Sequence, residues 1–221
     1  MTPAVYCNIA TRDGTISDEV LVAVQAAVGH ANRAGVPAAM ARSRDPYTVA
    51  ACRNRAVATF LADPRFTHFL SLDDDVVPPA DAVTRLLALA DRRGAAVALG
   101  CYPTVRKPLA GPPFLYVAVM PAGRSGDAGW PRAWFDGDRE CEGGGTGCML
   151  VRREVFAALG HPWFRWVEHY DEPAALIRST SDDMDFCARA RLAGYSVWAD
   201  GGVRCGHRKT VDLSMFVPPT A

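Results

Sequence analysis

The stretch Phe69-Leu70-Ser71-Leu72-Asp73-Asp74-Asp75 decides the fold, because it joins an apolar run directly to three consecutive carboxylates. The apolar part, from Phe66 to Leu72, is typical of a buried strand. The following Val76-Val77-Pro78-Pro79 is typical of the turn that ends such a strand. The sequence therefore predicts a dense cluster of negative charge at the point where a core strand reaches the surface.

An acidic cluster of this kind suits a divalent cation. Like charges this close repel, and each carboxylate resists ionisation unless positive charge lies among them. Hard carboxylate oxygens favour Mg²⁺ or Mn²⁺ as that positive charge. An acidic turn that simply stays in water is the alternative, and this segment alone leaves both interpretations open.

Length and charge limit the protein class. The chain of 221 residues is long enough for one domain with a sizeable core. Its 24 basic and 24 acidic residues balance, so it lacks the basic excess expected of a nucleic-acid binder. No apolar stretch approaches the roughly 20 residues that span a bilayer, and the N-terminus shows no secretory signal pattern. We therefore expect a cytoplasmic protein without a membrane span.

The cysteines support the same compartment. There are seven of them, an odd number, and none forms a Cys-x-x-Cys pair. Several lie in apolar surroundings. Buried free thiols therefore fit better than a disulfide framework.

The first half of the chain alternates strand-like and helix-like segments. Such a rhythm predicts an α/β protein with a mainly parallel sheet flanked by helices, with ligands at the carboxyl ends of the strands. The acidic triplet lies at that edge, and so does Thr11-Arg12-Asp13-Gly14. Strands are expected at 5–10, 38–41, 66–72 and 96–101, and helices at 20–31 (with Ser17 as N-cap), 47–62 and 81–92.

The second half is less regular. Strands are expected at 114–120, 148–151 and 195–199, helices at 152–159 and 181–193, and long loops at 121–140 and 161–180. The glycine run Gly143–Gly147 either forms a flexible loop or lets the backbone approach a ligand closely. It matches neither a phosphate-binding loop nor a dinucleotide-binding motif, because no lysine follows it and it does not lie at the first strand–helix turn.

Two further features could carry chemistry. The pair Asp183/Asp185 opens a helix, where the helix dipole alone would explain acidic residues. His207 follows the last expected strand and could be an additional metal ligand, or an ordinary structural histidine. A zinc site with Cys205 is the weaker interpretation, because no second ligand pair has suitable spacing.

Taken in order, the motifs resemble those of a known family. The sequence carries Asp73-Asp74-Asp75 after a strand and Gly206-His207 near the end. Between them lie Gly145-Thr146-Gly147-Cys148-Met149-Leu150-Val151-Arg152-Arg153-Glu154-Val155-Phe156 and Ser181-Asp182-Asp183-Met184-Asp185-Phe186-Cys187. This order resembles glycosyltransferases of the A fold, and most of all the family 2-type enzymes of bacteria and phages. Cys52-Arg53-Asn54 is similar to an Ala-Arg-Asn that such proteins often carry. The resemblance spans residues 5 to 208.

The resemblance implies a single Rossmann-like domain over residues 1–221, with a mixed, mainly parallel sheet. Its nucleotide-binding half would cover about 1–110, and its acceptor and catalytic half about 111–221. Asp75, Asp73 and His207 would bind Mn²⁺ or Mg²⁺, with Asp73 nearer the sugar-nucleotide. The residues implied for the donor site are Thr11, Arg12, Arg53, Asp73, Asp74, Gly145 and Arg208.

The resemblance also implies the chemistry. Asp182 and Asp183 stand where the family usually has Glu-Asp, so one of them would be the general base, and Asp183 is the preferred candidate. The loop with Trp163 and Trp166 offers an acceptor platform, because aromatic faces pack against sugar rings, or else it forms a hydrophobic lid anchored to the core.

The predicted function is metal-dependent transfer of a sugar from a nucleotide-sugar, UDP-linked by default, to an acceptor hydroxyl with inversion. The acceptor would be a glycan, a small molecule or a protein. A nucleotidyltransferase that makes the nucleotide-sugar is one alternative, although the turn after the first strand lacks the glycine-rich basic loop that such enzymes need. A non-catalytic sugar or nucleotide binder on the same fold is the other.

Overall fold

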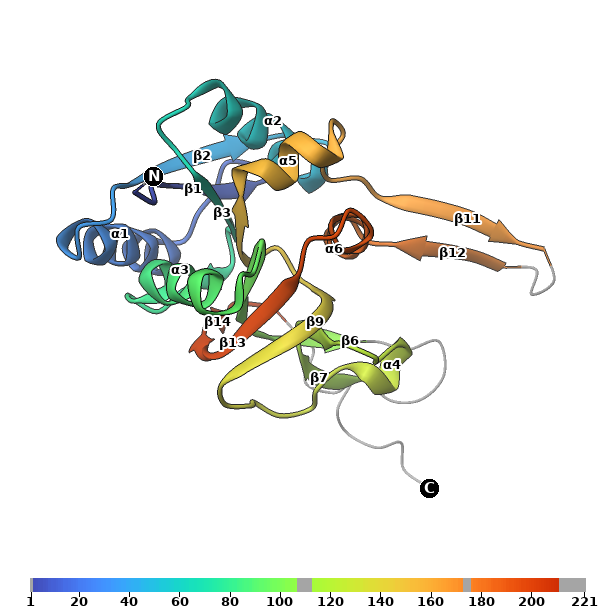
Figure 1. The fold of residues 1–221 in the computed structure, drawn as a ribbon. Coiled ribbons are helices and arrows are strands. Elements are labelled where there is room, and N and C mark those ends of the chain that lie inside the picture. Colours follow the sequence, from blue (N-terminus) through green and yellow to red (C-terminus); the bar gives the residue numbers. More distant parts are fainter. Residues whose placement is uncertain (1, 107–112, 173–175, 211–221) are drawn as a thin grey trace.

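The computed structural model describes residues 2–106, 113–172 and 176–210. Its centre is a mixed eight-stranded sheet with the order β2-β1-β3-β10-β5-β13-β9-β8 (Figure 1). The strands are β1 Val5–Thr11, β2 Ala38–Arg44, β3 His68–Asp73, β5 Val97–Cys101, β8 Val119–Pro121, β9 Asp138–Gly144, β10 Cys148–Arg152 and β13 Val197–Arg204.

The strand directions divide the sheet. Strand β1 runs parallel to both β2 and β3, and β13 runs parallel to β5. Between these two groups β10 is antiparallel to both β3 and β5. The far edge, β9 with β8, is also antiparallel. The expected α/β protein with a mixed sheet is therefore present, and the first three strands are parallel as predicted, but the eight-stranded sheet as a whole has three parallel and four antiparallel pairings and so is not mainly parallel.

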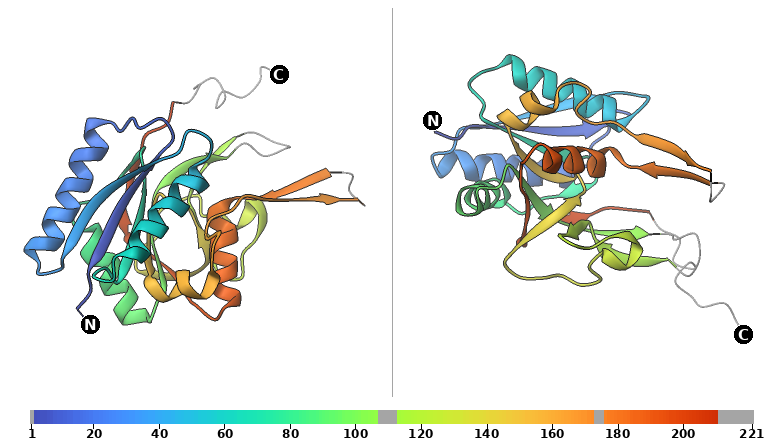
Figure 2. Two further views of the ribbon diagram at one scale, coloured as in Figure 1. Left: turned by 90° about the horizontal axis from the view of Figure 1, so that it is seen from above. Right: turned by 45° about the vertical axis from the view of Figure 1, so that its right-hand side comes forward.

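Helices cover both faces of the sheet (Figure 2). One face packs against α1 Asp18–Arg33 and α3 Ala82–Arg93, and the other against α2 Val49–Ala62, α5 Arg153–Leu159 and α6 Asp182–Leu192. Alternation along β3 explains the two cores, because Phe69 belongs to one cluster and Leu70 to the other. Burial of each such side chain contributes about 1.5–3 kcal/mol.

The predicted elements of the first half are confirmed. The Ser17 side chain accepts a hydrogen bond from the Val20 amide, as expected of an N-cap. Strand β3 ends at Asp73, and the acidic turn leads to the short β4, Val76–Val77. All seven cysteines are buried and free, as predicted.

Two predicted loops contain strands instead. Residues 161–180 hold a hairpin of β11 Val167–Asp171 and β12 Leu176–Thr180, which projects from the body of the protein (Figure 1). Because the hairpin packs on no core, its sequence lacks the apolar alternation of a half-buried strand. Likewise, residues 138–140 belong to β9, which continues into the glycine run, and Gly143 and Gly144 are buried strand residues.

A further short element, α4 Gly126–Gly129, lies in the loop expected at 121–140. Two small two-stranded sheets complete the fold. One pairs β6 Pro103–Arg106 with β7 Phe114–Val117, and the other pairs β4 with β14 Gly206–His207. The second of these joins the end of the chain's last described segment to the acidic turn.

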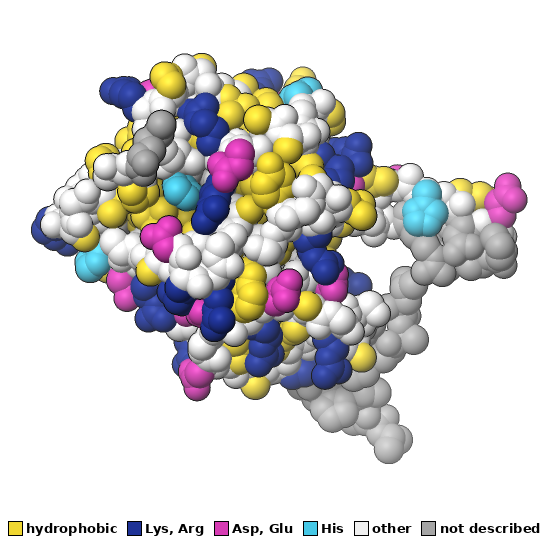
Figure 3. All heavy atoms as spheres, viewed as in Figure 1, with side chains coloured by type: hydrophobic (Ala, Val, Ile, Leu, Met, Phe, Trp, Pro, Cys, Tyr) yellow, Lys and Arg dark blue, Asp and Glu magenta, His cyan; other side chains and the backbone are white. Residues whose placement is uncertain are grey.

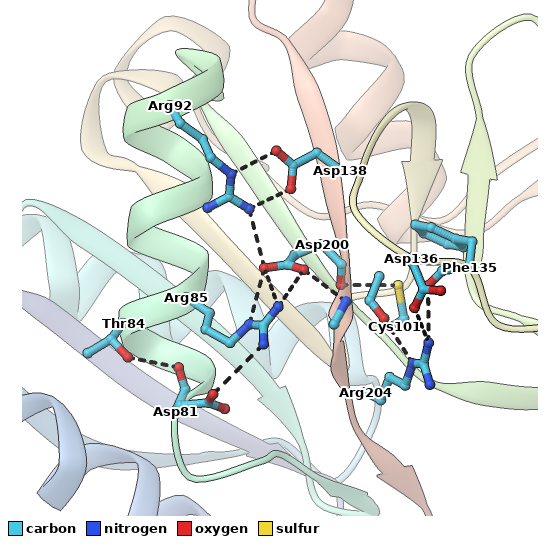
Figure 4. Close-up of polar contacts among 12 residues, drawn as sticks. Asp81, Thr84, Arg85, Arg92, Cys101, Phe135, Asp136, Asp138, Asp200 and Arg204 are labelled. Atoms are coloured by element: carbon cyan, nitrogen blue, oxygen red, sulfur yellow. Dashed lines mark hydrogen bonds and ion pairs between the residues drawn. The ribbon is translucent and has the colours of Figure 1, made fainter.

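A charged network fixes the strand that leads to β14 (Figure 4). Asp200, only 2% exposed, receives the Arg85 guanidinium of α3 at 3.0 Å, at the start of a register shift in β13. Next to it Arg92 binds Asp138 of β9 at 2.7 Å. Hydrogen bonds from Arg92, together with Arg93, lower the pKa of Asp138 to about 2 despite some burial. The network thus ties α3, β13 and β9 together just before the chain turns toward His207.

Candidate active site

The candidate site lies at the carboxyl ends of β1 and β3. Ala10 of β1 is in register with Asp73 of β3, so the turn after β1 and the acidic turn meet at one edge of the sheet. Arg12 and the three aspartates line a cleft of about 1030 Å³ there. Thr11 is fully buried instead. Its hydroxyl accepts a hydrogen bond from the Gly14 amide at 3.1 Å, so it stabilises the turn after β1 rather than lining the cleft.

A buried arginine, Arg53, forms ion pairs with two of the site's carboxylates. Arg53 of α2 is 5% exposed, and its guanidinium lies 2.6 Å from Asp73 and 2.6 Å from Asp182. Burial alone would lower the pKa of Arg53, but the charges of Asp73 and Asp182 raise it above its ordinary value. Arg53 is therefore a permanent cation that holds β3 and the start of α6 together.

Asp75 has different partners, both from the end of the described chain. One carboxylate oxygen lies 3.4 Å from His207 Nε2, and the other 2.5 Å from Lys209 Nζ. Burial favours the neutral acid, but the hydrogen bonds from His207 and Lys209 lower the pKa of Asp75 to about 2. For Asp74, burial and the charges of the two flanking aspartates raise the pKa.

The geometry of His207 fits a metal ligand. Its Nδ1 lies 2.7 Å from the Pro103 carbonyl, which can only accept, so Nδ1 carries a proton. Such a bond is the usual support of a metal-binding histidine, because it leaves Nε2 free to coordinate. Here Nε2 lies 3.4 Å from an Asp75 oxygen, and either a proton on Nε2 or a bound cation supplies the positive charge between the two atoms.

Asp75 and His207 would thus supply two ligands, and Mg²⁺ sites commonly take only one or two carboxylates from the protein and the rest from water and phosphate. Among the described residues, no three His, Cys, Asp or Glu side chains come close enough to hold an ion by themselves. Of the expected trio, Asp75 and His207 face each other at 3.4 Å, while one carboxylate oxygen of Asp73 is bound by Arg53.

A second, smaller pocket of about 230 Å³ adjoins the cleft. Asp73 and Lys209 line both cavities, so the two spaces meet at these side chains. The other residues that line the small pocket include His207, Arg106, Ser181, Asp183 and Gly145, and the aromatic residues Tyr102, Tyr116 and Trp130. The adjacent aspartates are therefore separated: Asp182 faces the large cleft and Asp183 the small pocket.

Asp183 has the environment of a general base. It accepts hydrogen bonds from the Ser181 hydroxyl and, at 2.7 Å, from the Met184 amide. Burial raises its pKa, although the Ser181 bond partly offsets this. No ion pair with Asp183 occurs among the described residues, so its proton affinity is not suppressed as that of a paired carboxylate would be.

Two glycines of the run, Gly145 and Gly147, pack closely against Tyr102. A Cβ atom on Gly145 would lie 1.7 Å from the phenol oxygen of Tyr102, which also accepts from the Gly147 amide at 3.2 Å. Close approach of an aromatic side chain therefore requires glycine at 145, whether or not a ligand also lies there. Sequence patterns do not reveal Tyr102, because it follows β5 without any motif.

The other residues predicted for the site differ in whether they line a cavity. Trp163 is buried and donates to the Phe156 carbonyl, so it belongs to the core, whereas Trp166 is 60% exposed and lines the cleft. The guanidinium of Arg208 binds Glu19 on α1, and Arg208 is not among the residues that line either cavity. Lys209, its neighbour, provides the cation at the junction.

No family model matches the chain, and neither does any curated protein. Solved structures do. A197 from STIV superposes with a TM-score of 0.59 at 17% identity, covering 94% of this chain and 86% of that one. The catalytic domain of Drosophila beta1,4galactosyltransferase 7, crystallised with xylobiose, gives 0.52 at 17% identity over 94% and 71% of the two chains. GalNAc-T7, crystallised with UDP, GalNAc and Mn²⁺, gives 0.55 at 9% identity over 96% and 44%.

The chain has the glycosyltransferase A fold. At these identities the likeness establishes the fold, and the roles of individual residues have to be argued from this chain. Within the described residues of the A-fold domain, no helix is long and apolar enough to cross a membrane. On the face shown in Figure 3, basic and acidic side chains are interspersed without a basic stripe.

Proposed function

We propose that this protein is a metal-dependent glycosyltransferase that moves a sugar from a nucleotide-sugar to an acceptor hydroxyl. The observation that carries the proposal is the junction of the two cavities at Asp73 and Lys209, where Asp75 lines the large cleft, Asp183 lines the small pocket, and His207 of the small pocket faces Asp75 at 3.4 Å. The fold, and the UDP and Mn²⁺ named with GalNAc-T7, support the same chemistry.

In this proposal the donor's nucleotide occupies the large cleft and its diphosphate lies toward Asp75. Arg12 and the exposed Tyr47 and Trp166 line that cleft and offer a cation and two aromatic faces for the nucleotide. Asp75 and His207 would hold Mn²⁺ or Mg²⁺, which supplies Lewis-acid stabilisation of the leaving diphosphate. We take UDP as the first nucleotide to test.

Asp183 would act on the other side of the transferred sugar. An acceptor hydroxyl in the small pocket would lose its proton to an Asp183 oxygen as the new bond forms, and a positioned base is typically worth ~10²–10⁴ in rate. With the nucleotide in the large cleft and the base in the adjoining pocket, a single displacement with inversion is the mechanism that this proposal favours. Asp182 is paired with Arg53 and faces the cleft, which supports Asp183 rather than Asp182 as the base.

The experiment is a transfer assay with a panel of UDP-sugars and saccharide acceptors in Mn²⁺, following both released UDP and the glycosylated product. We expect Asp183→Asn to lower kcat by about 10²–10⁴ while UDP binding is kept. Asp185→Asn is the matched control, since Asp185 lies on the same helix but pairs with Arg165 and Arg189. UDP binding without turnover of any donor in the panel would favour a non-catalytic binder, and full activity in Asp183→Asn would refute the proposed base.

A further inference from the structure

We propose that Lys209 is a resident counter-ion of the site, which occupies Asp75 in the free protein, yields it to the divalent cation, and then binds the donor's diphosphate. This inference rests on the proposed function. Lys209 would thus make an inhibitory contact with Asp75 before the cation binds, and a productive contact with the diphosphate afterwards.

Both oxygens of Asp75 are already in use. Its Oδ1 faces His207 Nε2 and its Oδ2 binds Lys209 Nζ at 2.5 Å. A divalent cation that takes Asp75 and His207 as ligands repels the ammonium beside it, because like charges a few ångströms apart are unfavourable. Lys209 and the cation therefore compete for the same carboxylate.

The backbone holds Lys209 at this place. The Arg208 amide donates to the Asp75 carbonyl at 2.8 Å, and β14 pairs with β4, which directly follows the acidic turn. The Arg208 side chain is also anchored, on Glu19. These contacts place Lys209 at the junction, where its side chain lines both cavities and is 50% exposed.

A comparison with Arg53 shows why Lys209 is the cation that moves. Arg53 has an exposed side-chain fraction of 6% and two carboxylate partners, so its removal would leave two carboxylates without their counter-charge. Lys209 has one carboxylate partner and a flexible four-carbon stem in contact with solvent. Its ammonium can turn from Asp75 into either cavity without breaking another ion pair among the described residues.

The test measures two affinities that should move in opposite directions. Mn²⁺ binding without nucleotide is followed by the loss of the free-ion EPR signal, and UDP binding at saturating Mn²⁺ by calorimetry. In Lys209→Met we expect Mn²⁺ to bind about fivefold more tightly, since an exposed ion pair is worth up to about 1 kcal/mol. UDP should bind at least about tenfold more weakly, since one charge-assisted hydrogen bond to phosphate is lost.

Arg208→Met is the matched control, because it removes the same charge one residue away without removing a partner of Asp75. We expect it to change Mn²⁺ affinity by less than Lys209→Met does. A merely structural role for Lys209 would weaken both ligands, and that result overturns the proposal, as does unchanged Mn²⁺ affinity. If none of the three proteins binds Mn²⁺ or UDP, the proposed function fails and this inference fails with it.

Discussion

Replacing Arg53 with methionine tests the charge arrangement at the base of the site. The substitution keeps a long side chain on α2 but removes the cation that lies 2.6 Å from both Asp73 and Asp182. The two carboxylates, with exposed fractions of 24% and 12%, would then face each other without a counter-charge. We expect the folded state to lose substantial stability.

The magnitude follows from the burial of the pair. Breaking a buried ion pair by removing one partner typically costs about 3–5 kcal/mol, because the remaining charge is left desolvated. That is a large part of the roughly 5–15 kcal/mol that stabilises an ordinary domain. For a chain of this size each kcal/mol lowers Tm by about 2–4 °C, so Arg53→Met should melt roughly 6–20 °C below the parent protein.

The assay is urea unfolding with thermal melting as a second measurement, on Arg53→Met and on Arg55→Met. Arg55 lies on the same helix but is 69% exposed, so its pair with Asp45 should be worth no more than about 1 kcal/mol. Adding Asp182→Asn to Arg53→Met should recover part of the loss, because one of the two unpaired charges is removed. If Arg53→Met costs no more than Arg55→Met, the reasoning about Arg53 is refuted.

Two further predictions concern the small pocket. Burial raises the pKa of Asp183 in the folded protein, so ionisation of this carboxyl group opposes folding. The protonated acid therefore stabilises the fold at low pH, and this contribution is lost as the pH rises through the raised pKa of Asp183. Asp183→Asn should therefore be at least as stable as the parent at pH 7 in thermal melts, and a clear loss of stability there would contradict this. Gly145→Ala should cost about 1–3 kcal/mol in urea unfolding, because the added methyl group overlaps the Tyr102 phenol, and an unchanged free energy of unfolding would show that Tyr102 moves freely.

Local sequence signals were sufficient for the parts of the fold that depend on near neighbours in the chain. The apolar run before Asp73 marks β3, and Ser17 caps α1 as its residue type suggests. The hairpin of β11 and β12 could not be found in this way, because it projects from the body and no core face imposes an alternating pattern. Strand β9 was obscured by glycines, which are depleted in strands generally but are required here by close packing against neighbours such as Ala118 and Cys187.

The candidate site shows the same limit. The order of the motifs predicts Asp73, Asp75, Asp183 and His207 near one edge of the sheet. In the structure these residues line two adjoining cavities. Which carboxylate pairs with which cation depends on contacts between residues far apart in the chain, such as Arg53 with Asp182. Spacing along the sequence carries no signal for such contacts, so neither the division between Asp182 and Asp183 nor the contact of Lys209 with Asp75 could be predicted.

The measurement that tests the central claim most directly is thermal unfolding with UDP or UDP-sugars, in the presence and absence of Mn²⁺, for the parent protein and for Asp75→Ala. A ligand at about 100 times its Kd stabilises the folded state by roughly 2.7 kcal/mol, which corresponds to a rise in Tm of about 5–11 °C for a chain of this size. The account predicts a shift of this order that needs both nucleotide and Mn²⁺ and is lost in Asp75→Ala. No shift with any nucleotide, or the same shift without Mn²⁺ and in the variant, would contradict it.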